Sequence, residues 1–117
     1  MEKIFEQGLL YDFYSELLTP HQRSIYEDAV FNDMSLGEIA EERGISRQGV
    51  HDLIKRCDKI LQGYESKLHL VAKFARAKET VREIMELTQP VDVRKAEGMQ
   101  SRMTRIRQLS EDLLKEL

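Results

Sequence analysis

Residues 38–56, EIAEERGISRQGVHDLIKR, carry side chains that can bind a nucleic acid. The guanidinium of Arg47 and the ammonium of Lys55 can bind guanine or phosphate, and the amide of Gln48 can pair with adenine. A helix that buries Val50 would leave all three on its outward side. Such a set of side chains suits recognition of a ligand rather than covalent chemistry.

The same stretch has the spacing of a helix-turn-helix. Ala40 is small enough for two helices to touch, and Gly44 can adopt the left-handed conformation of the turn. Val50, six positions further on, can pack the second helix against the first. Ser35 and Ser46 are suitable caps for the two helices. We expect the remaining core positions to be filled by Ile39, Ile45 and Leu53. The alternative is an ordinary helical hairpin.

Inward packing of one apolar stripe on the second helix determines which residues face outward. That stripe is Val50, Leu53, Ile54 and Cys57. We therefore predict a DNA-binding surface made of Ser46, Arg47, Gln48, His51, Lys55 and Arg56. Asp52 is unfavourable beside phosphates, although it can accept a hydrogen bond from a cytosine amine. For each of these residues the alternative is a solvated polar side chain.

Residues 18–61, LTPHQR…SLGEIAEERGISRQGVHDLIKRCDKIL, resemble the fourth region of bacterial sigma factors. The fuller resemblance, over nearly the whole chain, is to the YlxM family of small bacterial proteins. It rests on the aromatic helix LLYDFYSELLT, on QGYESKL after the motif and on the charged helical tail. The resemblance implies a regulatory protein. It also implies a link to the signal recognition particle, since genes of this family usually lie beside the gene for its protein component.

Charge is distributed unevenly along the chain. Residues 1–44 contain 3 basic and 10 acidic side chains, a net charge of −7, and residues 45–82 contain 9 and 4, a net charge of +5. Residues 83–117 contain 6 and 7, so the total is −3. Because affinity for DNA depends largely on neutralised phosphates, Glu38, Glu41 and Glu42 would repel the backbone if they faced it. Gly49 can allow close approach to a backbone or can simply be tolerated.

Apolar periodicity predicts helices throughout and no strand, hence an all-α fold. We expect a first helix over residues 5–18 with Leu10, Phe13, Tyr14 and Leu17 on one face. A capping box at Thr19 and Gln22 starts a second helix, which Asn32 and Asp33 end. The helix-turn-helix follows, without a wing. We place one domain at residues 1–62 and a helical extension at 63–117.

The extension carries two apolar stripes. The first continues to about Thr88 and consists of Tyr64, Leu68, Val71, Phe74, Val81, Ile84 and Met85. Gly63 either kinks the helix or lies in an uninterrupted one. The last helix starts at about Asp92, and its stripe consists of Met99, Met103, Ile106, Leu109 and Leu113. We expect these stripes to form a homodimer interface or to dock a protein or RNA partner; they can also simply fold back on the first helices.

Catalysis and metal binding are not indicated. Cys57 lies on an inward stripe, where a lone thiol is usually a packing residue. His21, His51 and His69 lack the spacing of metal ligands, and no phosphate-binding loop is present. We expect no enzyme, no metal and no cofactor. The single cysteine, the acidic amino terminus and the lack of a long apolar run favour a cytoplasmic protein without a signal peptide or membrane span.

These observations predict a helix-turn-helix regulatory protein that binds duplex DNA as a homodimer. The resemblance to the YlxM family implies a place in the signal recognition particle pathway. In the alternative, the chain is an accessory protein of that particle. The motif is then a scaffold that contacts protein or RNA and does not read DNA.

Overall fold

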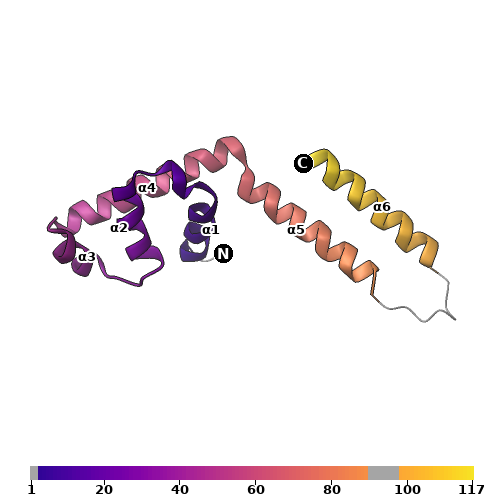
Figure 1. Cartoon of the computed structure of the whole chain (residues 1–117), viewed down its shortest axis with the longest axis horizontal. Helices are drawn as coiled ribbons and strands as arrows, with labels where there is room; N and C mark the ends of the chain where they lie inside the picture. The colour runs from indigo at the N-terminus through magenta and orange to yellow at the C-terminus, as the bar shows by residue number, and fades with distance from the viewer. Residues whose placement is uncertain (1–2, 90–97) are drawn as a thin grey trace. The chain divides into compact units, whose positions relative to one another are not determined.

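The computed structural model describes residues 3–89 and 98–117, which are helical and contain no strand (Figure 1). This confirms the all-α fold. The elements are α1 (Lys3–Tyr14), the 3-10 turn η1 (Ser15–Leu17), α2 (Pro20–Val30), α3 (Leu36–Arg43), α4 (Arg47–Leu68), α5 (Leu70–Leu87) and α6 (Met99–Glu116). The contacts divide the chain into two compact units, Met1–Val71 and Ala72–Leu117, here called unit 1 and unit 2. The sequence had suggested a boundary after residue 62.

In unit 1, α1, α2 and α3 all pack against α4 (Figure 1). Helix α1 ends earlier than expected, because the chain tightens into η1 at residues 15–17. As a result Leu10 and Tyr14 are buried, whereas Leu17 is 53% exposed. The prediction that Leu17 belongs to the inner face was wrong, since a 3-10 turn rotates it away from the stripe of an α-helix.

The predicted caps are present. Thr19 accepts a hydrogen bond from the backbone of Gln22 at 3.1 Å, and the Gln22 side chain accepts one from the backbone of Thr19 at 3.0 Å. Helix α2 ends at Val30, and Asp33 takes a positive φ of 52° in the turn that follows. These reciprocal bonds satisfy backbone donors that a helix start otherwise leaves unpaired.

The buried side chains of unit 1 form two adjoining clusters around α4. One contains Leu10, Tyr14, Leu18, Tyr26, Cys57 and Leu61, and the other contains Ile25, Ile39, Ala40 and Val50. Cys57 is fully buried, as expected, and burial raises the pKa of its thiol to about 11. Ile45 is 39% exposed, so its predicted core position was wrong. It sits in the turn between α3 and α4, where it is not held by the periodicity of either helix.

Helix α4 runs through Gly63 without a break and ends at Leu68, and its C-cap residue His69 adopts the left-handed conformation with φ 56° and ψ 27°. The sequence had suggested a helical stripe without this interruption. Contacts from α1 hold the backbone at the break between α4 and α5. The Tyr14 hydroxyl donates to Glu65 Oε1 at 2.5 Å and accepts from the backbone of Leu70 at 3.2 Å. Glu65 Oε1 also accepts from the backbone of Val71 at 3.0 Å. Amide groups at the start of α5 are therefore satisfied at the bend.

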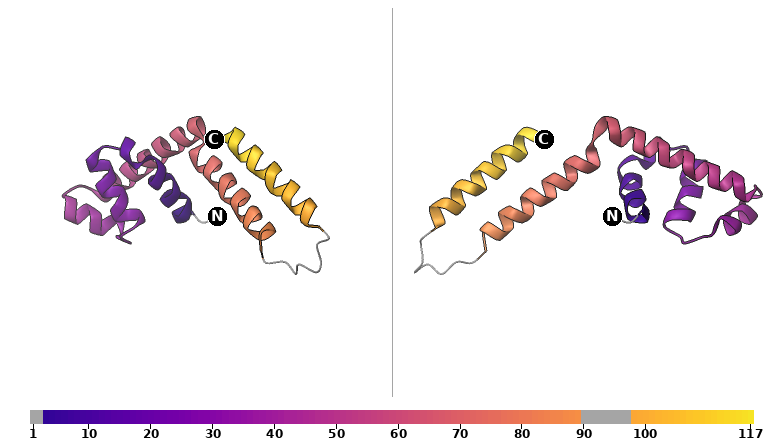
Figure 2. Two further views of the ribbon diagram at one scale, coloured as in Figure 1. Left: turned by 45° about the vertical axis from the view of Figure 1, so that its right-hand side comes forward. Right: turned by 180° about the vertical axis from the view of Figure 1, so that it is seen from behind.

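Unit 2 consists of most of α5 together with α6, which run antiparallel side by side (Figure 2). Two ion pairs join them: Arg76 with Glu116 at 3.6 Å and Arg105 with Glu83 at 3.1 Å. Leu109 is buried, but Met103, of the same predicted stripe, is 64% exposed. The expected start of the last helix near Asp92 lies outside the described residues.

Candidate nucleic-acid interface

The turn between α3 and α4 has the local geometry of a helix-turn-helix. Ser35 and Glu38 form a capping box, with Ser35 Oγ accepting from the Glu38 backbone at 3.1 Å. Gly44 takes φ 67° and ψ 33°, and its N–H donates to the carbonyl of Ala40. Ala40 is buried where α3 meets α4. Each of these features was expected from the spacing of the residues.

The start of α4 is shaped by a second cap. Ser46 Oγ accepts from the backbone of Gly49 at 2.9 Å. A Cβ at position 49 would lie only 3.0 Å from the same Ser46 oxygen, closer than an ordinary contact. The glycine therefore leaves room for the capping hydroxyl. This gives a structural role to Gly49, for which the sequence left two interpretations open.

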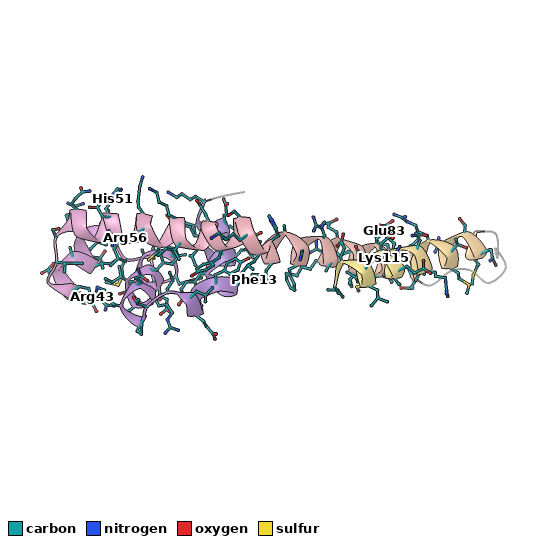
Figure 3. The ribbon with its side chains drawn as sticks, turned by 90° about the horizontal axis from the view of Figure 1, so that it is seen from above. Phe13, Arg43, His51, Arg56, Glu83 and Lys115 are labelled. Carbon is teal, nitrogen blue, oxygen red and sulfur yellow. The ribbon has the colours of Figure 1, made fainter. Side chains whose placement is uncertain are left out.

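The predicted DNA-binding residues lie on the side of α4 that is not used for packing. Ser46, Arg47, Gln48, Lys55 and Arg56 are exposed, and His51 is half-exposed. Figure 3 labels His51 at the free edge of α4 and Arg43 on the opposite side, among the other helices of unit 1. Five of the six predicted residues therefore lie on α4, and Ser46 is its N-cap.

Two of the six are already hydrogen bonded to Asp52. Gln48 Nε2 donates to Asp52 Oδ1 at 2.9 Å, and His51 Nδ1 lies 3.5 Å from the same oxygen. This arrangement orients the Gln48 amide and leaves its carbonyl oxygen and one N–H available for a base edge. Asp52 thus positions a side chain that can read adenine.

Arg47 and Gly37 lie close together at the join of the two helices. The ideal position of a Cβ on Gly37 is 3.7 Å from Arg47 Nε and 3.9 Å from its guanidinium carbon. The Arg47 side chain therefore leans over the start of α3 while it remains exposed to solvent. An extra methyl group at residue 37 would touch the guanidinium without a clash.

Arg43 does not neutralise the negative charge of the acidic side chains on its own helix, α3. Arg43 Nη2 donates to Asp28 Oδ2 at 2.8 Å and to Ser24 Oγ at 2.5 Å, which commits its charge to α2. Hydrogen bonds from Asn32 and then from Arg43 hold the pKa of Asp28 below its usual range. Glu38, Glu41 and Glu42 are all exposed. The positive field of this motif must therefore come from α4.

Two polar networks in unit 1 join residues that no sequence pattern had placed together. Asp58 Oδ1 accepts from the Tyr26 hydroxyl at 2.6 Å and from Gln7 Nε2 at 3.0 Å. Tyr14 and Glu65 form the second network, at the end of α4. Burial and then the hydrogen bond to Asp58 raise the pKa of Tyr26. A long sequence separation hid these pairs, and no local pattern marks them.

Comparison with known proteins agrees with this geometry. Residues 1–102 match the UPF0122 family of helix-turn-helix proteins, described as YlxM/p13-like. The chain belongs to this family. It is 47% identical over 93 residues to a UPF0122 protein of Acetivibrio thermocellus, covering 80% of each chain.

Two further relatives have similar coverage. The UPF0122 protein YlxM of Bacillus subtilis is 46% identical over 87 residues, which are 74% of this chain and 79% of the relative. A UPF0122 protein of Caldanaerobacter subterraneus is 51% identical over 78 residues, 67% of each chain. The resemblance to the YlxM family is confirmed. UPF0122 is a helix-turn-helix family rather than an enzyme family.

Residues 3–89 and 98–117 contain no cluster of three or more His, Cys, Asp or Glu side chains placed to hold a metal ion. Within the same residues, no helix is both long and apolar enough to cross a membrane.

Proposed function

We propose that this chain is a non-enzymatic regulator that binds duplex DNA through the outward face of α4. The observation that carries the proposal is the division of this helix into two sides. Val50, Cys57 and Leu61 are fully buried on one side, and the predicted base-contacting residues are exposed on the other. A helix-turn-helix places its second helix in the major groove in this way.

The individual side chains have suitable chemistry for such a groove. Arg47 can form two hydrogen bonds to guanine or one ion pair to phosphate, and Gln48 can bind the N6 and N7 edge of adenine. Lys55 lies two turns beyond Arg47, where a phosphate contact is favoured. Ser46 uses its hydroxyl oxygen as a cap but keeps its O–H donor.

We also propose that the chain acts as a homodimer held by unit 2. In α5, Val81 is 45% exposed and Met85 is also exposed, and in α6 Leu114 is 75% exposed. Two helices can bury only one apolar stripe between them. A second copy of the hairpin can pack against the remaining apolar side chains and bury them. Two copies of α4 would double the phosphate contacts and offset the acidic face of α3.

A gel-shift titration with duplex DNA tests the DNA-binding proposal. We expect Arg47→Ala with Lys55→Ala to weaken binding by about 1–3 kcal/mol for each base contact that is removed, and less for a phosphate contact. The matched control is Lys3→Ala with Lys115→Ala, because both lysines are exposed outside α4 and the same charge is removed. If the two double variants bind alike, α4 is not the reading helix.

A second candidate function is an accessory role in the signal recognition particle pathway, which the resemblance to the YlxM family implies. The exposed apolar residues of α5 and α6 favour it, because such a surface can bind a protein partner as well as a second copy. In this case the chain would leave duplex DNA unshifted at low salt. It would instead bind the purified RNA or protein component of the particle.

A further inference from the structure

Helix α4 is longer than base reading requires. It has 22 residues, and a helix of that length spans about 33 Å. The residues predicted to meet bases lie in its first three turns, up to Arg56. The second half of the helix, residues 57–68, therefore has an outer face to which the proposed function assigns no role.

The acidic side chains in this second half are turned away from that face. Asp58 accepts from Tyr26 and Gln7, with its second oxygen, Oδ2, 3.2 Å from Gln7 Nε2. Glu65 accepts from Tyr14 and from the backbone at the start of α5. Both carboxylates are thus held by hydrogen bonds on the packed side of α4, with the result that neither lies on the outer face.

The basic side chains take the opposite orientation. Those of Lys55, Arg56, Lys59 and Lys67 are exposed. Within residues 3–89 and 98–117, the basic side chains within ion-pair distance of a carboxylate are Arg43, His51, Arg76, Arg82, Arg105 and Arg107, and none of them is a lysine. The four α4 cations therefore have no acidic partner among the described residues. The exposed charged side chains on the outer face beyond Asp52 are therefore all basic.

The spacing of these cations makes one continuous stripe. Lys55 and Lys59 lie four residues apart, and Gln62 and Ser66 continue the same line of the helix with steps of three and four. Arg56 and Lys67 are eleven residues apart, close to three full turns, and flank that line on one side. The stripe contains no carboxylate after Asp52.

We propose that this stripe binds the sugar-phosphate backbone of the same DNA duplex whose bases meet the first turns of α4. The inference rests on the proposed function, and it adds Lys59 and Lys67 as contact residues. Lysine is a flexible point charge without the fixed fork of arginine, which suits phosphate binding without sequence preference. Asp52 lies between the first turn of α4, which meets the bases, and this basic stripe. It holds Gln48 toward the bases and repels phosphate.

Salt dependence of binding distinguishes backbone contacts from base contacts. The probe is a fluorescein-labelled duplex carrying the sequence that the wild-type chain selects from a random pool, followed by fluorescence anisotropy. Removal of one lysine–phosphate ion pair should reduce the slope of log K against log salt by about 0.9. We expect this for Lys59→Ala, and twice this for Lys59→Ala with Lys67→Ala. Lys59→Arg, which keeps the charge, should restore the slope.

The sequence preference supplies a second readout. Lys59→Ala should weaken binding to the selected duplex and to a random duplex by the same factor, whereas Arg47→Ala should weaken the selected duplex more. The charge-matched control, Lys3→Ala with Lys115→Ala, should keep the wild-type slope. Far-ultraviolet circular dichroism should show wild-type helix content for every variant, because all the substituted positions are exposed.

Three results would overturn the inference, and they differ in what else they affect. If the wild type binds DNA but Lys59→Ala with Lys67→Ala keeps the full slope, the stripe is wrong and the proposed function stands. If the wild type does not bind duplex DNA at low salt, both fail. If a duplex RNA of equal length is bound more tightly than DNA, and the double variant loses that binding alone, the stripe belongs to an RNA ligand.

Discussion

Units 1 and 2 are built from similar amphipathic helices but bury very different amounts of apolar surface. The described part of unit 1 has ten buried hydrophobic residues, three of them on α4 itself, while in the described part of unit 2 Leu109 alone is buried. Unit 1 brings three helices, α1, α2 and α3, against α4, which encloses a core on several sides. Unit 2 pairs two helices, so each has an apolar side left at the surface.

This difference shows how the same helical periodicity leads to two outcomes. A stripe becomes a core only when enough other helices cover it, and α1, α2 and α3 supply that cover in unit 1. The stripes of α5 and α6 cover each other in part. We therefore expect unit 1 to be stable by itself and unit 2 to depend on association.

Removal of unit 2 should have the largest effect. A chain ending at Val71 keeps the hydrogen bonds of Tyr14 with Glu65 and Leu70, so we expect it to retain the fold of unit 1. Truncation near Gly63, by contrast, would remove those hydrogen bonds. By sedimentation at tens of micromolar, the intact chain should be a dimer and the truncated chain a monomer that binds duplex DNA poorly.

An intact chain that sediments as a monomer would exclude the proposed dimer. A dimer that persists after truncation would move the interface to α1. Tyr14 is buried and Tyr11 stacks on Tyr26, so the surface available there consists mainly of Ile4 and Phe5. Phe5→Asp in the truncated chain would then be the variant that yields a monomer.

The second-largest difference between the units should appear when a buried leucine of each unit is shortened to alanine. Leu61 is fully buried, and Leu61→Ala should lower the free energy of unfolding by about 2–5 kcal/mol. Leu109→Ala should lower it by less than half of that, because neighbours surround Leu109 on fewer sides. Urea unfolding followed by circular dichroism measures both. Leu17→Ala, at a position of unit 1 that is 53% exposed, is the control and should change stability by less than about 0.5 kcal/mol. Equal losses for Leu61→Ala and Leu109→Ala would mean that unit 2 has a core comparable to that of unit 1.

The third-largest effect should be a loss of stability when a larger side chain is placed between α3 and α4. Ala40 is buried between α3 and α4, so Ala40→Leu should destabilise the chain by about 1–3 kcal/mol. Ala75→Leu, at an exposed position of α5, is the matched control and should leave the melting temperature nearly unchanged. An unchanged melting temperature for Ala40→Leu itself would contradict the close packing of α3 on α4.

The smallest effect concerns the ion pair between α2 and α3. The folded-state pKa of Asp28 lies below its unfolded value of about 3.9, so ionised Asp28 stabilises the fold above that pH. The contribution disappears as the pH falls through the folded-state pKa. We expect Asp28→Asn to cost no more than about 1–2 kcal/mol at neutral pH.

Thermal unfolding measured from pH 7 down to about pH 2 checks the sign of this effect. The difference between Asp28→Asn and the wild type should shrink at the acid end, because the wild type then loses the same charge. Asp12→Asn, at an exposed position of α1, should show no such convergence. A difference that is constant with pH would mean that the charge of Asp28 does not stabilise unit 1.

The interactions that span three or four residues could be predicted from the sequence. The capping boxes at Thr19 and Ser35, the cap at Ser46 and the left-handed Gly44 all appear where the residue types placed them. Within the candidate site, the exposure of Arg47 and Gln48 followed from the inward packing of Val50. Such features are local, because each depends on hydrogen bonds or periodicity within one or two helical turns.

Tertiary structure alone decided where α4 ends and which way its carboxylates point. Tyr14 and Glu65 are 51 residues apart in the chain, as are Gln7 and Asp58, and both pairs meet only after α1 packs on α4. The sequence determined that α4 carries acidic and basic residues. Packing then turned Asp58 and Glu65 inward to tyrosine hydroxyls and left the lysines outside, because a hydrogen-bonded carboxylate tolerates the helix interface and an unpaired ammonium does not.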